Sequence, residues 1–225
     1  MKNTESEYAG DNYERTGAKF NLDIFLNARE MCISTTHKII SEIQSGMNEK
    51  DIKDLVDKHF SKIGVTKFWH PTKIRIQSDT MKSFRELSDP HLKCAIGDIC
   101  FLDLGPVIQE HEADYGKTFL VGKSETNSLI QTCHAIFDSC AQKWKLERLS
   151  GKKLFEYANE LAKKQGYKLN PMMSGHRLGD FPHKLFSSEK LFEIESVPTK
   201  NLWVLEIHII DESKNTGAFF EDILL

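Results

Sequence analysis

Two hairpin-like segments, each with a pair of acids inside apolar strand patterns, constrain the fold of this 225-residue chain most strongly. The first segment reads FLDLGPVIQEHEADYGKTFLVG and contains Asp103 and Asp114. If this hairpin is centred between Ile108 and Gln109, Asp103 faces Asp114, and directly opposite side chains lie about 4.5–5.5 Å apart at Cβ. Two buried carboxylates at that distance repel each other, and a cation between them removes the repulsion.

The second segment repeats this pattern near the end of the chain. Glu206 lies in WVLEIHII and Glu221 in AFFEDILL, and a hairpin centred between Ser213 and Lys214 places the two glutamates opposite each other. A single acid in an edge strand commonly just points to water, and a one-residue slip in register would turn it to the other face. Because two matched pairs occur, we expect two related halves that contribute to one metal site.

Two histidines lie between the hairpins, in MMSGHRLGDFPHKLF. His176 sits between glycine-bounded turns, and His183 follows seven residues later. Taken alone, either histidine is more often structural than catalytic. Together with four carboxylates, however, an imidazole makes a hard, oxygen-rich ligand set that suits Mn(II), Fe(II) or Co(II), with Zn(II) as a further alternative.

The remaining sequence predicts one compact α+β domain over residues 21–225, preceded by a flexible arm over residues 1–20. Apolar residues at helical spacing predict four helices, over residues 21–45, 48–63, 126–144 and 152–164. Strand patterns occupy residues 68–77, 98–104, 112–121, 202–210 and 218–224. No composition shift or linker marks a further domain boundary.

Charge and cysteine usage exclude several classes of protein. The formal net charge is -3 and no long basic run occurs, which argues against a nucleic-acid partner and an anionic membrane partner. The five cysteines include no C-x-x-C pair, so reduced thiols are expected rather than a disulfide framework. The polar N-terminus is not typical of a secretory signal. We therefore expect a cytoplasmic protein.

In their order along the chain, these segments resemble the methionine aminopeptidase, prolidase and creatinase superfamily. FLDLGPVIQEHEADYGKTFLVG is similar to that family's D-x-G…D-x-x-x-T-F-x-V-G segment, and SGHRLGDFPHK is similar to its G-H-x-(I/L)-G…H segment. VLEIHI and FFEDILL resemble its two glutamate strands. The resemblance covers the chain from about Asn21 to the C-terminus. It implies a pita-bread fold, which is a pseudo-symmetric antiparallel sheet covered by helices.

The resemblance also implies two divalent metal ions, with manganese as the first choice and iron, cobalt or zinc as alternatives. Five residues would hold them: Asp103, Asp114, His176, Glu206 and Glu221. Asp103 would bind one ion through both oxygens, while Asp114 and Glu221 would bridge the pair. A hydroxide between the ions would be the nucleophile. Glu206 would also relay the proton, and His183 would contact the scissile peptide.

Several positions depart from the family pattern. Phe84 stands where the family places a substrate-site histidine. His70 in FWHPTK would replace it from another direction or be a surface histidine beside a proline. Arg177 would bind a substrate carboxylate or form a surface ion pair. His208 shares a face with Glu206 by the period of two, so it would line the site or cap the end of the strand.

These expectations lead to a metallo-exopeptidase, an aminopeptidase or dipeptidase that acts on short peptides, with Xaa-Pro bonds preferred. The alternatives are a hydrolase of a non-peptide C–N bond and a non-catalytic binding module. Prolidases and creatinases carry a large N-terminal domain, whereas only about twenty residues precede the first helix here, so no separate N-terminal domain is expected. Members of this family are commonly homodimers, so the resemblance also implies a homodimer.

Overall fold

The structure is a computed structural model that describes residues 14–185 and 187–225. Six antiparallel strands form the main sheet, in the order β1-β2-β5-β8-β7-β6. Their bounds are Lys73–Ile76 (β1), Ile99–Leu104 (β2), Tyr115–Leu120 (β5), Lys168–Leu169 (β6), Val204–Asp211 (β7) and Thr216–Ile223 (β8). Two short strands, Val107–Ile108 (β3) and His111–Glu112 (β4), pair with each other apart from this sheet.

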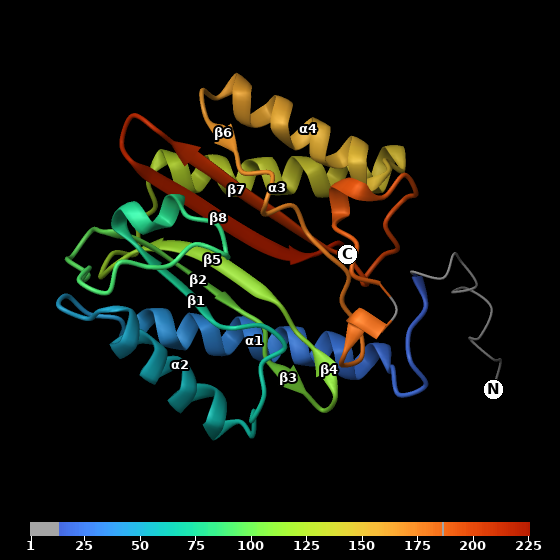
Figure 1. Cartoon of the computed structure of the whole chain (residues 1–225), viewed down its shortest axis with the longest axis horizontal. Helices are drawn as coiled ribbons and strands as arrows, with labels where there is room; N and C mark the ends of the chain where they lie inside the picture. Colours follow the sequence, from blue (N-terminus) through green and yellow to red (C-terminus); the bar gives the residue numbers. More distant parts are fainter. Residues whose placement is uncertain (1–13, 186) are drawn as a thin grey trace.

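Four helices cover the sheet in two pairs (Figure 1). They are Leu22–Glu42 (α1), Glu49–Lys62 (α2), Ser128–Glu147 (α3) and Gly151–Lys164 (α4). Each begins after a side chain that accepts a hydrogen bond from a free backbone N–H of the first turn, namely Asn21, Asn48, Asn127 and Ser150. Side chains of α1 and α2 share a core with β1, β2 and β5, whereas those of α3 and α4 share one with β7 and β8.

The molecule therefore consists of two halves with the same topology. The N-terminal half contains α1, α2, β1, β2 and β5, and the C-terminal half contains α3, α4, β6, β7 and β8. The strand order reads the same from either edge of the sheet, because each half contributes three strands in mirrored order. This confirms the predicted α+β class and the pseudo-symmetric sheet.

The seam between the halves is short. Strands β5 and β8 pair at only two positions, Gly116 with Glu221 and Lys117 with Phe220. Beyond them, the hydroxyl of Thr118 donates to the carbonyl of Phe219 at 2.8 Å and accepts from its N–H at 2.7 Å. A side chain thus takes over from the backbone ladder where the two strands diverge.

The register of the first hairpin differs from the prediction. Asp103 pairs with Gly116 and not with Asp114, because residues between the two strands fold into the small β3–β4 hairpin. The register of the second hairpin is confirmed, since Glu206 pairs with Glu221. The strand predicted over residues 68–77 is limited to β1, and residues 68–72 bend ahead of it.

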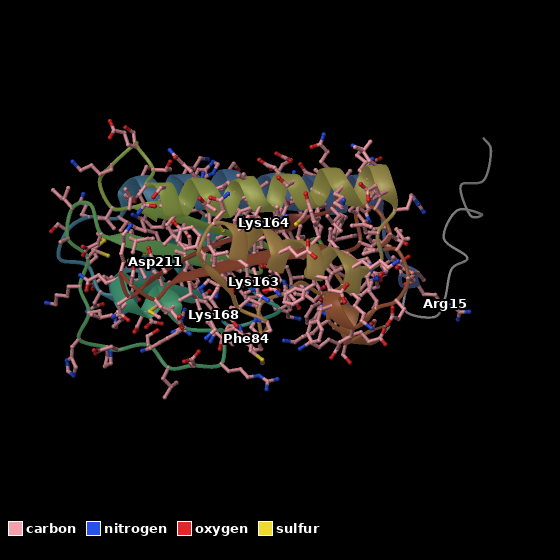
Figure 2. All side chains as sticks on the ribbon, turned by 90° about the horizontal axis from the view of Figure 1, so that it is seen from above. Arg15, Phe84, Lys163, Lys164, Lys168 and Asp211 are labelled. Carbon is pink, nitrogen blue, oxygen red and sulfur yellow. The ribbon has the colours of Figure 1, made fainter. Side chains whose placement is uncertain are left out.

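The expected arm falls partly outside the described residues, which exclude residues 1–13. Residues 14–20 lie against the body: Glu14 is buried and accepts a hydrogen bond from Nε1 of Trp203 at 3.0 Å, and the N–H of Gly17 donates to Asp180 at 2.8 Å. In the view from above, Arg15 lies at the opposite end of the molecule from Asp211 (Figure 2). Within residues 14–185 and 187–225, none of the helices combines the length and the apolar character that a membrane crossing requires.

Candidate metal centre

A row of paired positions crosses the seam of the sheet. Asp103 of β2 pairs with Gly116 of β5, Gly116 pairs with Glu221 of β8, and Glu221 pairs with Glu206 of β7. Residues directly opposite in a sheet project to the same face, so three carboxylates converge there. A Cβ on Gly116 would lie 2.6 Å from Oε1 of Glu221, which means that the glycine leaves the space that this carboxyl group occupies.

Asp114 and His176 complete this group. Asp114 lies just before β5 and is 2% exposed. Its Oδ2 lies 2.9 Å from Nε2 of His176, and Oε1 of Glu206 lies 3.6 Å from the same nitrogen. His176 is fixed beside β7, because its carbonyl accepts from the N–H of Val204 at 2.9 Å. Its Nδ1 lies 2.9 Å from the carbonyl oxygen of Arg177, which can only accept, so Nδ1 carries a proton and Nε2 is left for the acids.

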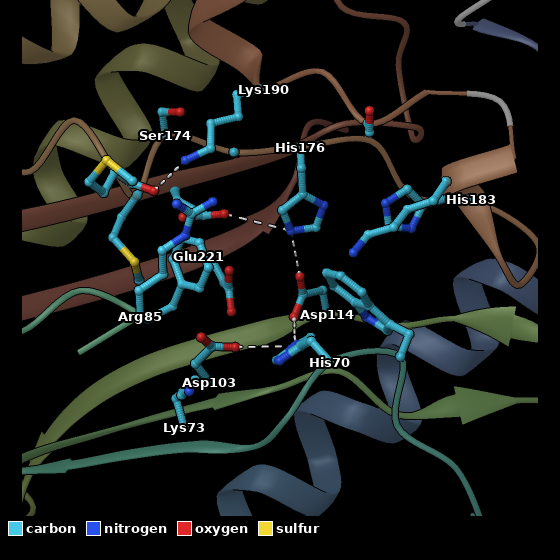
Figure 3. A pocket seen from close by; sticks show the side chains of 18 of the residues that line it. His70, Lys73, Arg85, Asp103, Asp114, Ser174, His176, His183, Lys190 and Glu221 are labelled. Atoms are coloured by element: carbon cyan, nitrogen blue, oxygen red, sulfur yellow. Dashed lines mark hydrogen bonds and ion pairs between the residues drawn. The ribbon is translucent and has the colours of Figure 1, made fainter. Parts of the chain in front are cut away.

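All five predicted metal ligands line one cavity of about 430 Å³ (Figure 3). Each comes from a different place in the chain, and both halves contribute. The cavity is also lined by His70 and His183, by apolar side chains that include Trp69, Phe84 and Met173, and by four basic residues, Lys73, Arg85, Lys184 and Lys190. Phe84 therefore does lie at the site, as its alignment with the family histidine predicts.

The electrostatics of the cavity reflect crowded, buried acids. Burial raises the pKa of Glu221 well above its usual range, and the neighbouring carboxylates of Asp114 and Asp103 raise it further. Burial also raises the pKa of Glu206 to about 7, although His176 opposes this shift. Burial would lower the pKa of His176, but the contact with Asp114 raises it to about 9. Protons on these groups offset the repulsion, and divalent cations would do the same.

The residues present fit a pair of divalent ions. Oε1 of Glu221 is buried and has no hydrogen-bond partner among the described residues, so it is available to a ligand. Ligand atoms from Asp114, His176 and Glu221 lie within 4.8 Å of one another, and so do atoms from His70, Asp103 and Asp114. Carboxylate oxygens with imidazole nitrogens suit Mn(II), Fe(II), Co(II) and Zn(II).

His183 lines the cavity in a fixed orientation. Its Nδ1 lies 2.6 Å from Oε2 of Glu112, and its backbone N–H donates to Oε1 of the same side chain at 3.0 Å. The carboxylate of Glu112 is 1% exposed and can only accept when ionised, so it holds the proton of His183 on Nδ1. The other ring nitrogen, Nε2, is then the one offered to a substrate.

Arg177 and His208 do not line the cavity, so their expected substrate-binding roles do not fit their placement. Arg177 is buried behind His176, where its guanidinium donates to the carbonyl of Arg15 at 2.8 Å. His208 is buried further along β7, with Nε2 2.7 Å from the carbonyl of Thr80 and Nδ1 3.0 Å from the amide nitrogen of Asn170. These contacts match a neutral ring, and burial lowers its pKa to about 4.

Two residues of the site, Glu112 and Trp69, were not predicted from the sequence. Glu112 precedes Asp114 by two residues, and the period of two could have placed both on one face. Trp69 carried no comparable signal, because it lies in the bend before β1. Its indole packs against the rings of His70, His176 and His183, with centroids 4.3, 4.8 and 5.1 Å away.

Known proteins share this architecture. Similar solved structures include an X-Pro aminopeptidase from Thermotoga maritima MSB8 (20% identity, TM-score 0.73, 91% of this chain and 59% of that chain) and a prolidase from Pyrococcus furiosus (20%, 0.71, 90% and 59%). A prolidase from Pyrococcus horikoshii OT3 is 21% identical, with a TM-score of 0.73, and the match covers 92% of this chain and 59% of that chain. The chain thus spans less than two thirds of these proteins, and the likeness concerns the fold. No curated protein matches it. The model of metallopeptidase family M24 matches residues 23–225, and the chain belongs to this family.

Proposed function

We propose that this protein is a dinuclear metal-dependent exopeptidase, an aminopeptidase or dipeptidase that hydrolyses the N-terminal peptide bond of short peptides. One observation carries the proposal: four carboxylates, of which Asp103, Asp114 and Glu221 are buried, and Nε2 of His176 converge on one cavity across the seam of the sheet. Membership of a metallopeptidase family supports it. Manganese is the first metal to test, followed by iron, cobalt and zinc.

Five residues would hold the two ions: Asp103, Asp114, His176, Glu206 and Glu221. When bound, the ions would supply an activated water and polarise the scissile carbonyl. Glu206 would take the proton released by the attacking water on a carboxylate oxygen and pass it to the leaving amine. His183, oriented by Glu112, would hydrogen-bond to the substrate peptide through Nε2. Trp69 would exclude water from the side of the cavity where the three histidine rings meet.

The walls of the cavity favour a short substrate with a free carboxylate. Lys73 of β1 pairs with Asp103 of β2 and extends the row of the metal centre. The charged groups of Arg85 and Lys190 lie 5.3 and 5.4 Å from the ring centroid of Phe84. Within the described part of the chain, none of the cavity's four basic residues forms an ion pair. A peptide carboxylate would supply the missing partner. The names of the similar structures support Xaa-Pro bonds as the first substrates to try.

Product analysis by mass spectrometry tests this function. The Mn(II)-loaded protein is incubated with Xaa-Pro, Met-Ala and proline-free peptides, each prepared with a free and an amidated C-terminus. We expect release of N-terminal residues, with the free-carboxylate peptides cleaved faster, and no release by an Asp114→Ala control purified in parallel. If two ions are bound and every peptide remains intact, the peptidase proposal is wrong, and a non-peptide C–N bond or a binding role becomes the next hypothesis.

A further inference from the structure

His70 and His176 approach the same carboxylate from opposite sides (Figure 3). Nε2 of His176 lies 2.9 Å from Oδ2 of Asp114, and Nε2 of His70 lies 3.3 Å from Oδ1. Each oxygen of Asp114 therefore faces one imidazole nitrogen. We propose that His70 is itself a metal ligand, so that each of the two ions receives one imidazole. This inference rests on the metal centre of the proposed function, but not on peptide hydrolysis.

The distances around His70 fit a shared ion better than direct hydrogen bonds. Its Nε2 lies 3.3 Å from Oδ1 of Asp103 as well as 3.3 Å from Oδ1 of Asp114. A charge-assisted N–H···O bond is usually about 2.7–2.9 Å long. Two ligand atoms that each lie about 2.0–2.2 Å from one ion are themselves about 3.0–3.4 Å apart. Both separations from Nε2 of His70 are thus those expected of ligands around a common ion on the Asp103 side, and ligand atoms of His70, Asp103 and Asp114 all lie within 4.8 Å of one another.

The two histidines are held by the same device. Nδ1 of His70 lies 3.0 Å from the carbonyl oxygen of Pro71, and Nδ1 of His176 lies 2.9 Å from that of Arg177. In each case the partner is the carbonyl of the next residue, which holds the proton on Nδ1 and directs the lone pair of Nε2 at the acids. Metal-ligating histidines typically donate their second N–H to a carbonyl or carboxylate in this way.

The surroundings of His70 fix its ring in place. A Cβ on Gly105 would lie 2.2 Å from Cδ2 and 2.3 Å from Nε2 of His70, so only glycine leaves room for the imidazole. Trp69 is anchored by two hydrogen bonds, from its backbone N–H to the carbonyl of Gly105 at 2.9 Å and from Nε1 to the carbonyl of Ala113 at 3.0 Å. Its indole then packs against both histidine rings. The imidazole of His70 is thus held in position before any ligand binds.

Proton NMR of the Co(II)-loaded full chain tests the assignment. An imidazole bound to Co(II) through Nε2 shows its Nδ1–H as a strongly shifted resonance that disappears in D₂O. We expect two such resonances in the wild-type protein and one in each of His70→Ala and His176→Ala. The matched control is His91→Ala, which removes an exposed histidine and should retain both. Counting the wild-type resonances requires no variant, so a variant that fails to fold does not remove the test.

Metal affinity gives a second readout. Loss of a residue that only supports a ligand commonly lowers metal affinity by about 10–100-fold. Loss of a direct ligand should cost at least as much, so His70→Ala should lower the affinity for one of the two ions by at least that factor. Titration with Co(II), followed by metal analysis after dialysis, measures it. Two bound ions with a single shifted resonance, lost only in His176→Ala, would overturn the assignment and leave the peptidase proposal intact. Two resonances without peptide cleavage would support the His70 assignment and reject the peptidase proposal. Absence of metal binding would reject both the assignment and the peptidase proposal.

Discussion

The two halves of the molecule share one topology but place their acids differently. In the C-terminal half, Glu206 and Glu221 face each other directly across β7 and β8. In the N-terminal half, Asp103 faces Gly116, and Asp114 lies two residues earlier, before β5 begins. The β3–β4 hairpin, which has no counterpart between β7 and β8, accounts for this shift.

This difference shows how a pseudo-symmetric scaffold makes an asymmetric site. Near the seam, one half provides an acid, Glu221, and the other provides an empty position, Gly116, into which that acid fits. The displaced Asp114 can then present one oxygen to a histidine of each half: His70 from the bend before β1, and His176 from the segment before β7. Exact repetition would instead have placed two facing acid pairs around the seam, without a shared central carboxylate.

The largest expected effect comes from removing the carboxylate that both halves share. Asp114→Ala should lose metal and reduce activity by at least about 10³-fold, because the charge stabilisation at both ion positions depends on it. Metal analysis after dialysis and the peptide assay measure this. Asp138→Ala, which removes an exposed acid on α3, is the matched control. Unchanged metal stoichiometry in Asp114→Ala would contradict the whole centre.

His183→Ala should separate chemistry from metal binding. His183 contacts Glu112 and lines the cavity, but it lies outside the five expected ligands, so we expect two bound ions and about 10²–10⁴-fold lower kcat. In Glu112→Gln, one amide oxygen replaces the two carboxylate oxygens that contact the backbone N–H and Nδ1 of His183. Because the imidazole is retained, we expect a smaller fall in kcat than in His183→Ala. Full activity in His183→Ala would show that its assigned role is wrong.

Gly116→Ala tests whether the empty position of the N-terminal half is required. The added Cβ would lie 2.3 Å from the ring of Phe219 and 2.6 Å from Oε1 of Glu221, so one of them must move. We expect about 1–3 kcal/mol lower free energy of unfolding and about 10–100-fold weaker metal binding. Chemical denaturation and metal titration measure the two effects. Gly179→Ala is the control, because its Cβ would meet only a guanidinium nitrogen at 3.3 Å; equal behaviour of both variants would refute this role.

The smallest expected effect is a pH dependence of the metal-free protein. Burial would lower the pKa of both His70 and His176, but the carboxylates raise each to about 9 from an ordinary 6.5. A raised folded-state pKa stabilises the fold below pH 6.5, and this stabilisation is lost as the pH rises through 9. Thermal unfolding in the presence of a chelator should therefore give a lower Tm at pH 9.5 than at pH 6.5.

Metal-loaded protein provides the comparison for this pH effect, because bound ions replace the protons and should flatten the dependence. His70→Ala and His176→Ala should each remove part of the metal-free dependence, one from each half. An equal fall in Tm with and without metal would show that the two histidines are not its source.

Local sequence signals predicted some elements well and others poorly. The turn between Glu206 and Glu221 is short, so alternation and turn length fixed their register. The longer connection after Asp103 folds into strands of its own, and no local pattern reveals that. Arg177 was expected at the surface or at the substrate, but its buried guanidinium donates to the carbonyls of Glu14 and Arg15, more than 160 residues earlier in the sequence. Only tertiary contacts between distant segments determine such positions.

The short seam between β5 and β8 has a consequence for how the chain unfolds. The two halves meet there at two paired positions and the hydroxyl of Thr118, while carboxylates from both sides stand directly over it. Ions bound to those carboxylates would act as a cross-link that closes a loop of about a hundred residues in the chain, and cross-links of that length restrict the unfolded ensemble most. Chelation should therefore lower the free energy of unfolding by releasing this cross-link between the halves.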